Sequence, residues 1–330
     1  MQTILDSFKS SNLLIESNVY DYLLREKVDK ILVACSGGAD SVFTLFLLLA
    51  YQKEIGFDLD VAHFNHQWRG VDSEKDAQYV KDIAKSLSLP YHYASDESVH
   101  QSKTETSARE ARIQFLRKTA IQLEAKVIAF GHQMDDILET QIQRLARGSG
   151  LEGLIAPRPV HVFEKYPCHI RPILNYSAAK IRLILKELSI QWCNDISNSD
   201  QSITRNKLRK SLIPSLELVM GRDVKEGANR SRFLLEEDFI CLDALAREAL
   251  PECFQLNHQL ERSKFRHLNK ALVRRGIFFW LHKMNPGFVA SAPFQEQLLN
   301  AVLSDQHGKK ISVGSQFIRM NKRYIWLENS

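Results

Sequence analysis

The sequence predicts an α/β protein: a doubly wound parallel sheet followed by a smaller, mainly helical domain that ends in a β-meander. Three observations support this class. Between residues 30 and 188, short apolar segments alternate with helical patterns at the spacing of a parallel sheet with helices on both faces. Residues 225–305 repeat their apolar side chains at helical intervals. Residues 309–327 alternate apolar and polar side chains, as strands of a small sheet do.

The length and composition allow two globular domains. A chain of 330 residues can bury about two separate cores. Its hydrophobic content of 44% and charged content of 25% are those of a globular protein. Pro214 and Gly221 mark a linker, so we predict domains at 1–215 and 216–330.

The composition does not favour a membrane or secreted protein. The longest apolar run, residues 42–50, is too short to span a bilayer. The N-terminus lacks a basic-then-apolar signal pattern, so we expect no export. Five cysteines form neither a C-x-x-C pair nor an even-numbered framework, which suits free thiols in a reducing cytosol. We therefore expect a cytoplasmic protein without a membrane partner.

Charge is unevenly distributed along the chain. Lys and Arg number 15 against 21 Asp and Glu over residues 1–143, 12 against 5 over 144–215, and 17 against 13 over 216–330. An acidic first part suits a protein that binds a metal and a cation, and a basic second part suits one that binds a polyanion. Charge alone, however, favours chance variation of a solvated surface.

The first β–α unit contains a turn built for anions. The apolar run that begins at Lys30 meets a Ser-Gly-Gly turn, and a helix follows over residues 42–52. Backbone N–H groups at the start of that helix, together with its dipole, point at whatever occupies the turn. The two glycines let a ligand approach the backbone, and the serine hydroxyls can donate hydrogen bonds to it. The carboxylate of Asp40 could hold Mg²⁺ between phosphate oxygens. The turn residues are Ser36, Gly37, Gly38, Ala39, Asp40 and Ser41.

The remaining elements continue the alternation. A leading helix is expected within residues 1–28. Further strands are expected at 59–65, 91–94 and 126–130, and helices at 73–88, 105–124, 133–147 and 177–188. In such sheets ligands bind beyond the carboxyl ends of the strands, and the unusual polar residues of this chain fall at those ends.

Two polar clusters follow predicted strands. The first cluster consists of His63, Asn65, His66 and Arg69. The second consists of His132, Asp135, Asp136 and Glu139. His132, either Asp135 or Asp136, and Glu139 lie three or four residues apart on a helix and share one face. Acidic residues in a first turn often serve only the helix dipole, but three carboxylates with a histidine favour metal or amine binding.

Two pairs of basic residues have the spacing of phosphate ligands. Arg109 and Arg112 are three apart on a helix and can reach one phosphate together, although surface salt bridges are the alternative. Arg205 and Arg209 lie one turn apart where an Asx- and Ser-rich loop gives way to a helix.

Two familiar nucleotide motifs are excluded. The turn after Lys30 lacks the lysine of a Walker A loop. The letters G-x-G-x-x-G occur at Gly148, Gly150 and Gly153, but there they end a helix instead of following a strand. We interpret them as a helix C-cap and loop, which excludes an NAD fingerprint.

Taken in order, these blocks resemble those of the tRNA(Ile)-lysidine synthetases, members of the ATP pyrophosphatase superfamily with a PP-loop. The resemblance is specific over about 30–210 and weaker over 215–330, which is similar to the family's first C-terminal domain and ends before the second one of longer members. Departures are Gln133, Trp68 and Thr204. Matching positions include Ser36 to Ser41, His63, Asn65, His66, Arg69, Glu105, Arg109, Arg112, His132, Asp135, Asp136, Glu139, Asp195, Asn198, Asp200, Arg205, Asn206 and Arg209.

The resemblance implies an adenine nucleotide alpha hydrolase-like fold and a ligase. Such an enzyme uses ATP and lysine to convert the wobble cytidine of the CAU-anticodon isoleucine tRNA to lysidine. The cytosine O2 attacks the α-phosphate, pyrophosphate leaves, and the lysine amine then displaces AMP. A homodimer is a further expectation.

The implied roles divide the site residues into groups. ATP would contact the turn residues with His63, Asn65, Arg109 and Arg112. The tRNA would contact Arg69, Arg205, Lys207 and Arg209. Asp40 and Asp136 would hold Mg²⁺. Catalysis would involve Asp40, His132, Asp135, Asp136, Glu139 and Arg205, and which of them is the base stays open.

Two other functions are considered. A tRNA 2-thiocytidine synthetase would need cysteines at C-x-x-C spacing, which this chain lacks. A non-catalytic nucleotide- or RNA-binding protein would not need Asp40 and an acidic helix.

Overall fold

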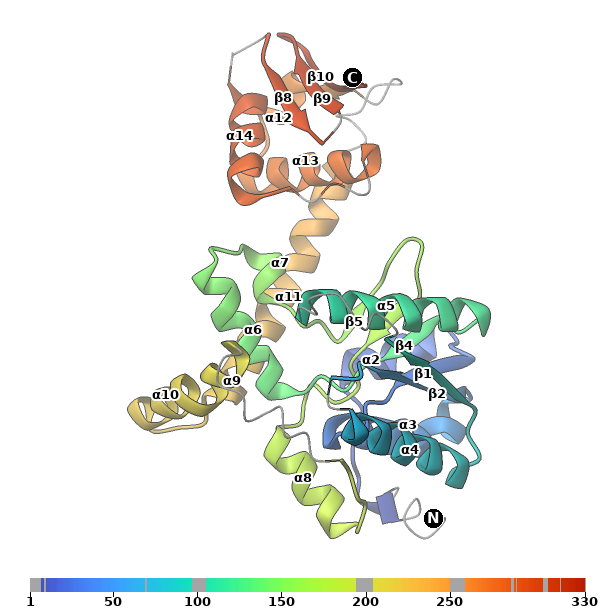
Figure 1. Cartoon of the computed structure of the whole chain (residues 1–330). Helices are drawn as coiled ribbons and strands as arrows, with labels where there is room; N and C mark the ends of the chain where they lie inside the picture. The colour runs from blue at the N-terminus through green and yellow to red at the C-terminus, as the bar shows by residue number, and fades with distance from the viewer. Residues whose placement is uncertain are drawn as a thin grey trace. The chain divides into compact units, whose positions relative to one another are not determined.

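The computed structural model describes residues 7–8, 10–68, 70–96, 105–193, 204–249, 259–285, 288, 290–304, 308–314 and 316–329. The chain forms two compact units (Figure 1). Unit 1 contains residues 1–147 and 155–232, and unit 2 contains residues 148–154 and 233–330.

Unit 1 is built on a six-stranded sheet whose strand order, among the described residues, is β3-β2-β1-β4-β6-β5. Five strands are parallel, and β5 alone pairs antiparallel, with β6. The strands are β1 (Lys30–Ala34), β2 (Asp58–Asn65), β3 (Tyr91–Ser95), β4 (Val127–Ala129), β5 (Val160–His161) and β6 (Cys168–Ile170). The order reverses between β1 and β4, so the loops after these two strands flank the topological switch point where such sheets bind ligands.

Helices cover both faces of this sheet, which confirms the predicted doubly wound architecture (Figure 1). Ile31 and Val33 of β1 join the core on the side of α3, whereas Leu32 between them packs in the cluster of α5. This alternation follows from the two-residue period of a strand. The covering helices are α2 (Ser17–Arg25), α3 (Ala39–Ile55), α4 (Val71–Ser86) and α8 (Ala178–Glu187) on one face and α5 (Glu105–Gln122) on the other.

A helical layer extends unit 1 beyond residue 215, where the sequence predicted a boundary. Ile137 and Leu138 share a buried cluster with Ile213 and Ala228. The apolar contacts therefore bind this stretch to the first unit as far as Arg232. The layer contains α6 (Met134–Ala146), α9 (Thr204–Lys207), the π-helix η2 (Leu208–Leu212), α10 (Ile213–Met220) and the first part of α11 (Val224–Ala249).

Unit 2 has its own core, with Trp280, Val302 and Ile318 fully buried. Its described helices are α7 (Leu151–Leu154), the second part of α11, α12 (Arg262–Phe265), α13 (Lys270–Met284) and α14 (Ala292–Leu303). Its four-stranded antiparallel sheet, in the described residues, has the order β7-β10-β9-β8. The strands are β7 (Leu260–Glu261), β8 (Lys310–Val313), β9 (Gln316–Met320) and β10 (Tyr324–Asn329), which confirms the predicted meander and adds β7.

A buried arginine links the elements of unit 2. The Arg262 side chain is fully buried and donates to backbone carbonyls near the C-terminus of α14, including Ala301 O at 2.9 Å, and to Asn321 O at 2.6 Å. It thus satisfies acceptors that a helix end leaves without partners.

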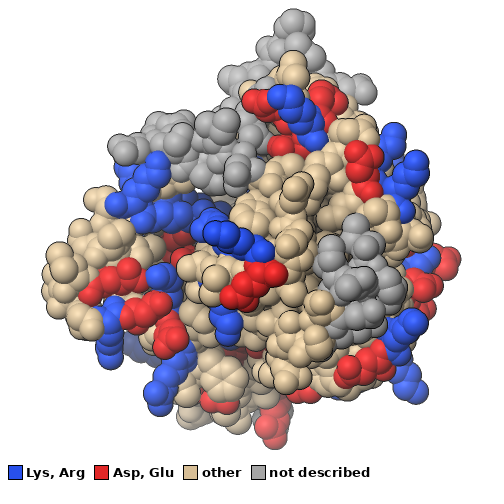
Figure 2. Space-filling model, turned by 90° about the horizontal axis from the view of Figure 1, so that it is seen from below, with Lys and Arg blue, Asp and Glu red and all other residues tan. Residues whose placement is uncertain are grey.

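No helix of the described residues combines the length and the apolar character needed to cross a membrane. The face seen in Figure 2 carries intermixed basic and acidic side chains, with a stripe of Lys and Arg on one part of it.

Candidate active site

The backbone of the loop that follows β4 packs against the backbone of the first turn of α3. A Cβ placed on Gly131 would lie 3.0 Å from the carbonyl carbon and oxygen of Asp40 and 3.0 Å from the nitrogen of Ser41. Only glycine allows so close an approach. The turn at residues 36–41, here called the phosphate turn, and the start of the acidic helix α6 are therefore immediate neighbours at the switch point of the sheet.

Hydrogen bonds inside the phosphate turn hold its shape. The Ser41 hydroxyl donates to Gly38 O at 2.9 Å and accepts from Ser36 N at 3.1 Å. Gly37 has a φ of +91°, a left-handed conformation that suits glycine, and its carbonyl accepts from Cys193 N at 2.9 Å. α3 begins directly after Gly38, so the first N–H groups of that helix lie in the turn with no intrahelical acceptor. The turn is a preorganised anion cradle.

Asp40 lies at the edge of this cradle with unused acceptor capacity. Its Oδ1 is buried and has no hydrogen-bond partner among the described residues. Burial, together with the negative charge of Asp136, raises the pKa of Asp40 to about 6, against the lowering effect of Arg182 and Arg209. A bound cation would favour the ionised form of such a carboxylate.

The residues present fit a magnesium ion that is shared with phosphates. Within the described parts of the chain, no group of three or more His, Cys, Asp or Glu side chains could hold a metal alone. Mg²⁺ usually takes only one or two carboxylates and completes its octahedron with phosphate oxygens and water. Asp40 and Asp136 are two carboxylates near enough to perturb each other.

A capping box fixes the start of α6. Gln133 Oε1 accepts from Asp135 N at 2.7 Å, and Asp136 Oδ2 accepts from Gln133 N at 3.0 Å. Asp135 Oδ2 accepts from Ala178 N at 2.9 Å, at the start of α8. The predicted acidic face is thus divided, since Asp135 links two helices while Asp136 and Glu139 lie together elsewhere.

Asp136 and Glu139 both bind the guanidinium of Arg209. Arg209 Nη2 lies 3.0 Å from Asp136 Oδ1, and Arg209 Nε donates to Glu139 Oε1. Glu139 is fully buried, and its Oε2 has no partner among the described residues. Burial raises the pKa of Glu139 to about 7, although Arg209 opposes that shift. Burial also raises the pKa of Asp136, against the hydrogen bond from Gln133 and the charge of Arg209.

His132 is buried among arginines. Its Nδ1 has no partner among the described residues. Burial lowers the pKa of His132 well below its usual value, and the charges of Arg171, Arg109, Arg112 and Arg205 lower it further. The imidazole is therefore neutral near pH 7.

Arg171 is a further buried group whose charge acts on His132, and the sequence analysis assigned it no role. It is 8% exposed and donates to Arg158 O at 2.6 Å, and its Nε has no partner among the described residues. Burial and the neighbouring Arg109 lower its pKa to about 10. The signal was its position directly after β6, a strand too short to be recognised in the sequence.

The described residues of the first polar cluster form hydrogen bonds with the loops at the carboxyl ends of β1 and β2 and with α4. His63 Nδ1 donates to Cys35 O at 2.9 Å, and burial lowers the pKa of His63. Asn65 donates to Glu74 Oε1 at 2.9 Å and accepts from Gln67 N at 2.8 Å. Arg69 and the predicted loop residues 195–200 lie outside the described part of the chain.

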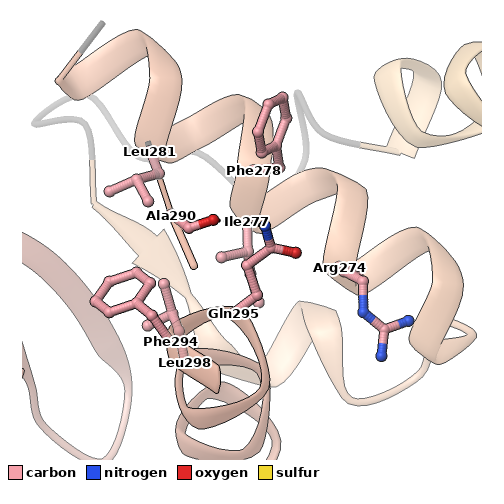
Figure 3. Close-up of a pocket in the computed structure, with 8 residues that line it drawn as sticks. All are labelled: Arg274, Ile277, Phe278, Leu281, Ala290, Phe294, Gln295 and Leu298. Carbon is pink, nitrogen blue, oxygen red and sulfur yellow. Dashed lines mark hydrogen bonds between the residues drawn. The ribbon is translucent and has the colours of Figure 1, made fainter. Parts of the chain in front are cut away.

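A hollow in unit 2 does not compete as a ligand site (Figure 3). Its interior measures about 20 Å³, room for about one water molecule. Gln295 Nε2 donates to Ala290 O at 3.1 Å, and the guanidinium of Arg274 points away from the apolar side chains. The lining residues are Arg274, Ile277, Phe278, Leu281, Ala290, Phe294, Gln295 and Leu298.

The fold and this site define an α/β protein with an anion cradle at the N-terminus of α3 and acidic groups beside it, which is the arrangement of nucleotide-binding proteins. The sequence model of the PP-loop domain, an ATP-binding domain, matches residues 11–216. The chain belongs to the PP-loop domain family, which confirms the family resemblance that the sequence blocks predicted.

Two relatives with sequence similarity share one name. The tRNA(Ile)-lysidine synthase of Dehalococcoides mccartyi (strain CBDB1) is 32% identical over 258 residues, which cover 74% of this chain and 55% of the relative. The enzyme of the same name from Geobacter sulfurreducens is 34% identical over 265 residues, covering 76% and 55%. The chain thus spans about half the length of the curated relatives it matches.

A solved structure supports the fold alone. The U34-tRNA thiolase NcsA from Methanococcus maripaludis, described with its [4Fe-4S] cluster, matches with a TM-score of 0.54 and 16% identity. The match covers 63% of this chain and 72% of that chain.

Proposed function

We propose that the protein is an ATP-dependent ligase that attaches lysine to C2 of the wobble cytidine, position 34, of the CAU-anticodon isoleucine tRNA. The product, lysidine, would change codon reading from AUG to AUA. The observation that carries the proposal is the backbone contact between Gly131 and Asp40, which joins an anion cradle to an acidic helix at one edge of the sheet. The similarity to tRNA(Ile)-lysidine synthases supports the same function.

In the first step the cytosine O2 attacks the α-phosphorus of ATP. A P–O bond to the base forms, the bond to the β-phosphate oxygen breaks, and pyrophosphate leaves. The N–H groups of the phosphate turn would stabilise the negative charge that develops on the leaving group. Asp40 and Asp136 would hold Mg²⁺, which offsets charge on phosphate oxygens. Arg109 and Arg112 are proposed phosphate ligands.

In the second step the lysine ε-amine attacks C2 of the adenylated base. The C2–N bond forms, the C2–O bond breaks, and the oxygen leaves with AMP. Free lysine carries an ammonium with a pKa of about 10.4 and must lose a proton before it attacks. We assign that proton to Glu139, because its Oε2 is buried and unpartnered among the described residues and its pKa is raised to about 7.

The RNA would be bound mainly through its backbone. Arg205 and Lys207 lie on α9, and Arg209 follows on η2, so three cations come within a few residues. Arg69 and the C-terminal domain are further proposed RNA contacts. The anticodon loop is single-stranded, and its base can enter the pocket without breaking a base pair.

The proposal includes a cytoplasmic protein that assembles as a homodimer. The four described cysteines are free thiols, which supports the reducing compartment. Light scattering of the purified chain tests the assembly: a mass twice that of the chain is expected, and a monomer would contradict it.

Labelled lysine tests the function. Purified protein is incubated with ATP, Mg²⁺, labelled lysine and tRNA transcripts. Label is expected only in the CAU-anticodon isoleucine transcript, together with AMP release. Retention of ATP without AMP would instead indicate a nucleotide-binding protein. Incorporation of sulfur from a donor, without lysine, would indicate a thiolase.

A further inference from the structure

Arg209 occupies the place that the proposed function gives to the substrate amine. Its guanidinium binds Asp136 Oδ1 and Glu139 Oε1, the two carboxylates beside the phosphate turn. The arginine lies on η2, a π-helical stretch. Such stretches are rare in proteins, and those that occur are often found at functional sites. The inference below rests on the proposed function.

The acceptors of the two carboxylates decide whether a second cation fits. Arg209 uses one oxygen of each carboxylate, and Asp136 Oδ2 accepts from Gln133 N. Only Glu139 Oε2 then has no partner among the described residues. A primary ammonium has three N–H donors, and one oxygen cannot satisfy them in a buried site. Without Arg209, both oxygens of Glu139 become available to the ammonium, and Asp136 Oδ1 becomes available to the proposed Mg²⁺.

Arg209 is also accessible to an outside anion. Its side chain is 39% exposed, whereas those of Asp136 and Glu139 are 10% and 0% exposed. A guanidinium binds phosphate in a two-pronged geometry. An RNA phosphate can therefore bind Arg209 without entering the buried site, and the ion pairs of Arg209 with Asp136 and Glu139 are exchanged for one with phosphate.

We propose that Arg209 is an internal competitor for the amine site: it closes the Asp136–Glu139 pair in the free protein, and an RNA phosphate withdraws it. Lysine then binds well only after the RNA. Arg209 is thereby a positioning residue that sets the order of binding, in addition to the RNA contact predicted from the sequence.

The expected change in lysine affinity follows from the fraction of molecules in which Arg209 binds Asp136 and Glu139. The apparent dissociation constant of lysine equals the intrinsic constant divided by the fraction of protein with a free site. If Arg209 occupies the pair in roughly 90–99% of molecules, its removal tightens lysine binding about 10- to 100-fold. Because coupling is reciprocal, RNA should tighten lysine binding to the natural protein by a similar factor.

The test measures binding of labelled L-lysine to the full chain by equilibrium dialysis, with and without the CAU-anticodon isoleucine transcript. Arg209→Met removes the competitor, and Lys210→Met removes an equal charge from the next residue of the same helix. The measurement is made at about pH 8.5, so that Glu139 is ionised while the lysine ammonium, with a pKa of about 10.4, stays protonated. Thermal unfolding of each variant checks the fold.

Without RNA, Arg209→Met should bind lysine at least about tenfold more tightly than the natural protein, and Lys210→Met should not differ from it. RNA should tighten lysine binding to the natural protein and to Lys210→Met but leave Arg209→Met unchanged. If Arg209 only supports the carboxylates, Arg209→Met binds lysine more weakly, which overturns the proposal.

Other outcomes remain decisive. If Arg209→Met does not fold, the natural protein decides, because equal lysine affinity with and without RNA contradicts the proposal. If the natural protein incorporates lysine into RNA but Arg209→Met binds lysine no more tightly than the natural protein, the competitor role of Arg209 is refuted and the proposed function stands. Absence of lysine incorporation under all conditions refutes the proposed function itself.

Discussion

Gly131→Ala tests the contact between the phosphate turn and the acidic helix. The new Cβ would lie 3.0 Å from three backbone atoms of Asp40 and Ser41, and an ordinary contact begins at 3.4 Å. The two segments must therefore separate by about 0.4 Å. None of the three atoms belongs to a side chain that could rotate away. Overpacking of this kind costs about 1–3 kcal/mol of unfolding free energy, and a displacement of this order in a reacting geometry lowers the rate by about tenfold or more.

Urea unfolding and the rate of AMP formation with tRNA, ATP and lysine provide the two measurements. Gly227→Ala is the control, because nothing lies within 4 Å of its added Cβ and the residue is within α11. A helical glycine replaced by alanine should stabilise the protein by about 0.5–1 kcal/mol, with the rate unchanged. A Gly131→Ala protein with unchanged stability and rate would refute the contact.

Three further predictions concern single residues. Asp40→Asn should abolish AMP formation. Burial raises the pKa of Asp40 in the folded protein from 3.8 to about 6, so the ionised carboxylate destabilises the fold. Above pH 6 the variant should therefore be more stable than the natural protein by up to about 3 kcal/mol, and this gain should shrink as the pH falls towards 4. An equal gain at all pH values would contradict the raised pKa. Arg262→Met should lower the unfolding free energy of unit 2 by about 3 kcal/mol or more in calorimetry, because buried carbonyls lose their donor; an unchanged transition would contradict this. Arg205→Ala should weaken tRNA binding and reduce the slope of log affinity against log salt by about 0.7–0.9, and an unchanged slope would count against a phosphate contact.

Much of unit 1 could be predicted from the sequence, because its elements have regular patterns. The strands β1 to β4 and the helices between them match apolar alternation and helical periodicity to within a few residues. The pair β5 and β6 was missed because it has only two and three residues. The grouping of residues 216–232 with unit 1 depends on tertiary contacts of Ile213 and Ala228 with α6, which no local pattern encodes.

The sequence indicates candidate site residues, but it does not indicate which of them contact one another. Spacing alone gives Asp135 and Asp136 equivalent roles, yet one binds the N-terminus of α8 and the other binds Arg209. The pairing of Arg209 with Glu139 joins residues 70 positions apart, which no local pattern encodes. The spacing of Arg209 from Arg205 indicated only that these two arginines share one helical face.

The most direct measurement follows the α-phosphate of labelled ATP through the two steps. Without lysine, the label should move onto the CAU-anticodon isoleucine transcript, and added lysine should release it as AMP. Glu139→Gln should retain the transfer to RNA and lose the release, because the acidic helix acts on the intermediate that the phosphate turn helps to form. Label that never reaches the RNA, or a Glu139→Gln protein that releases AMP at the natural rate, would contradict a shared site.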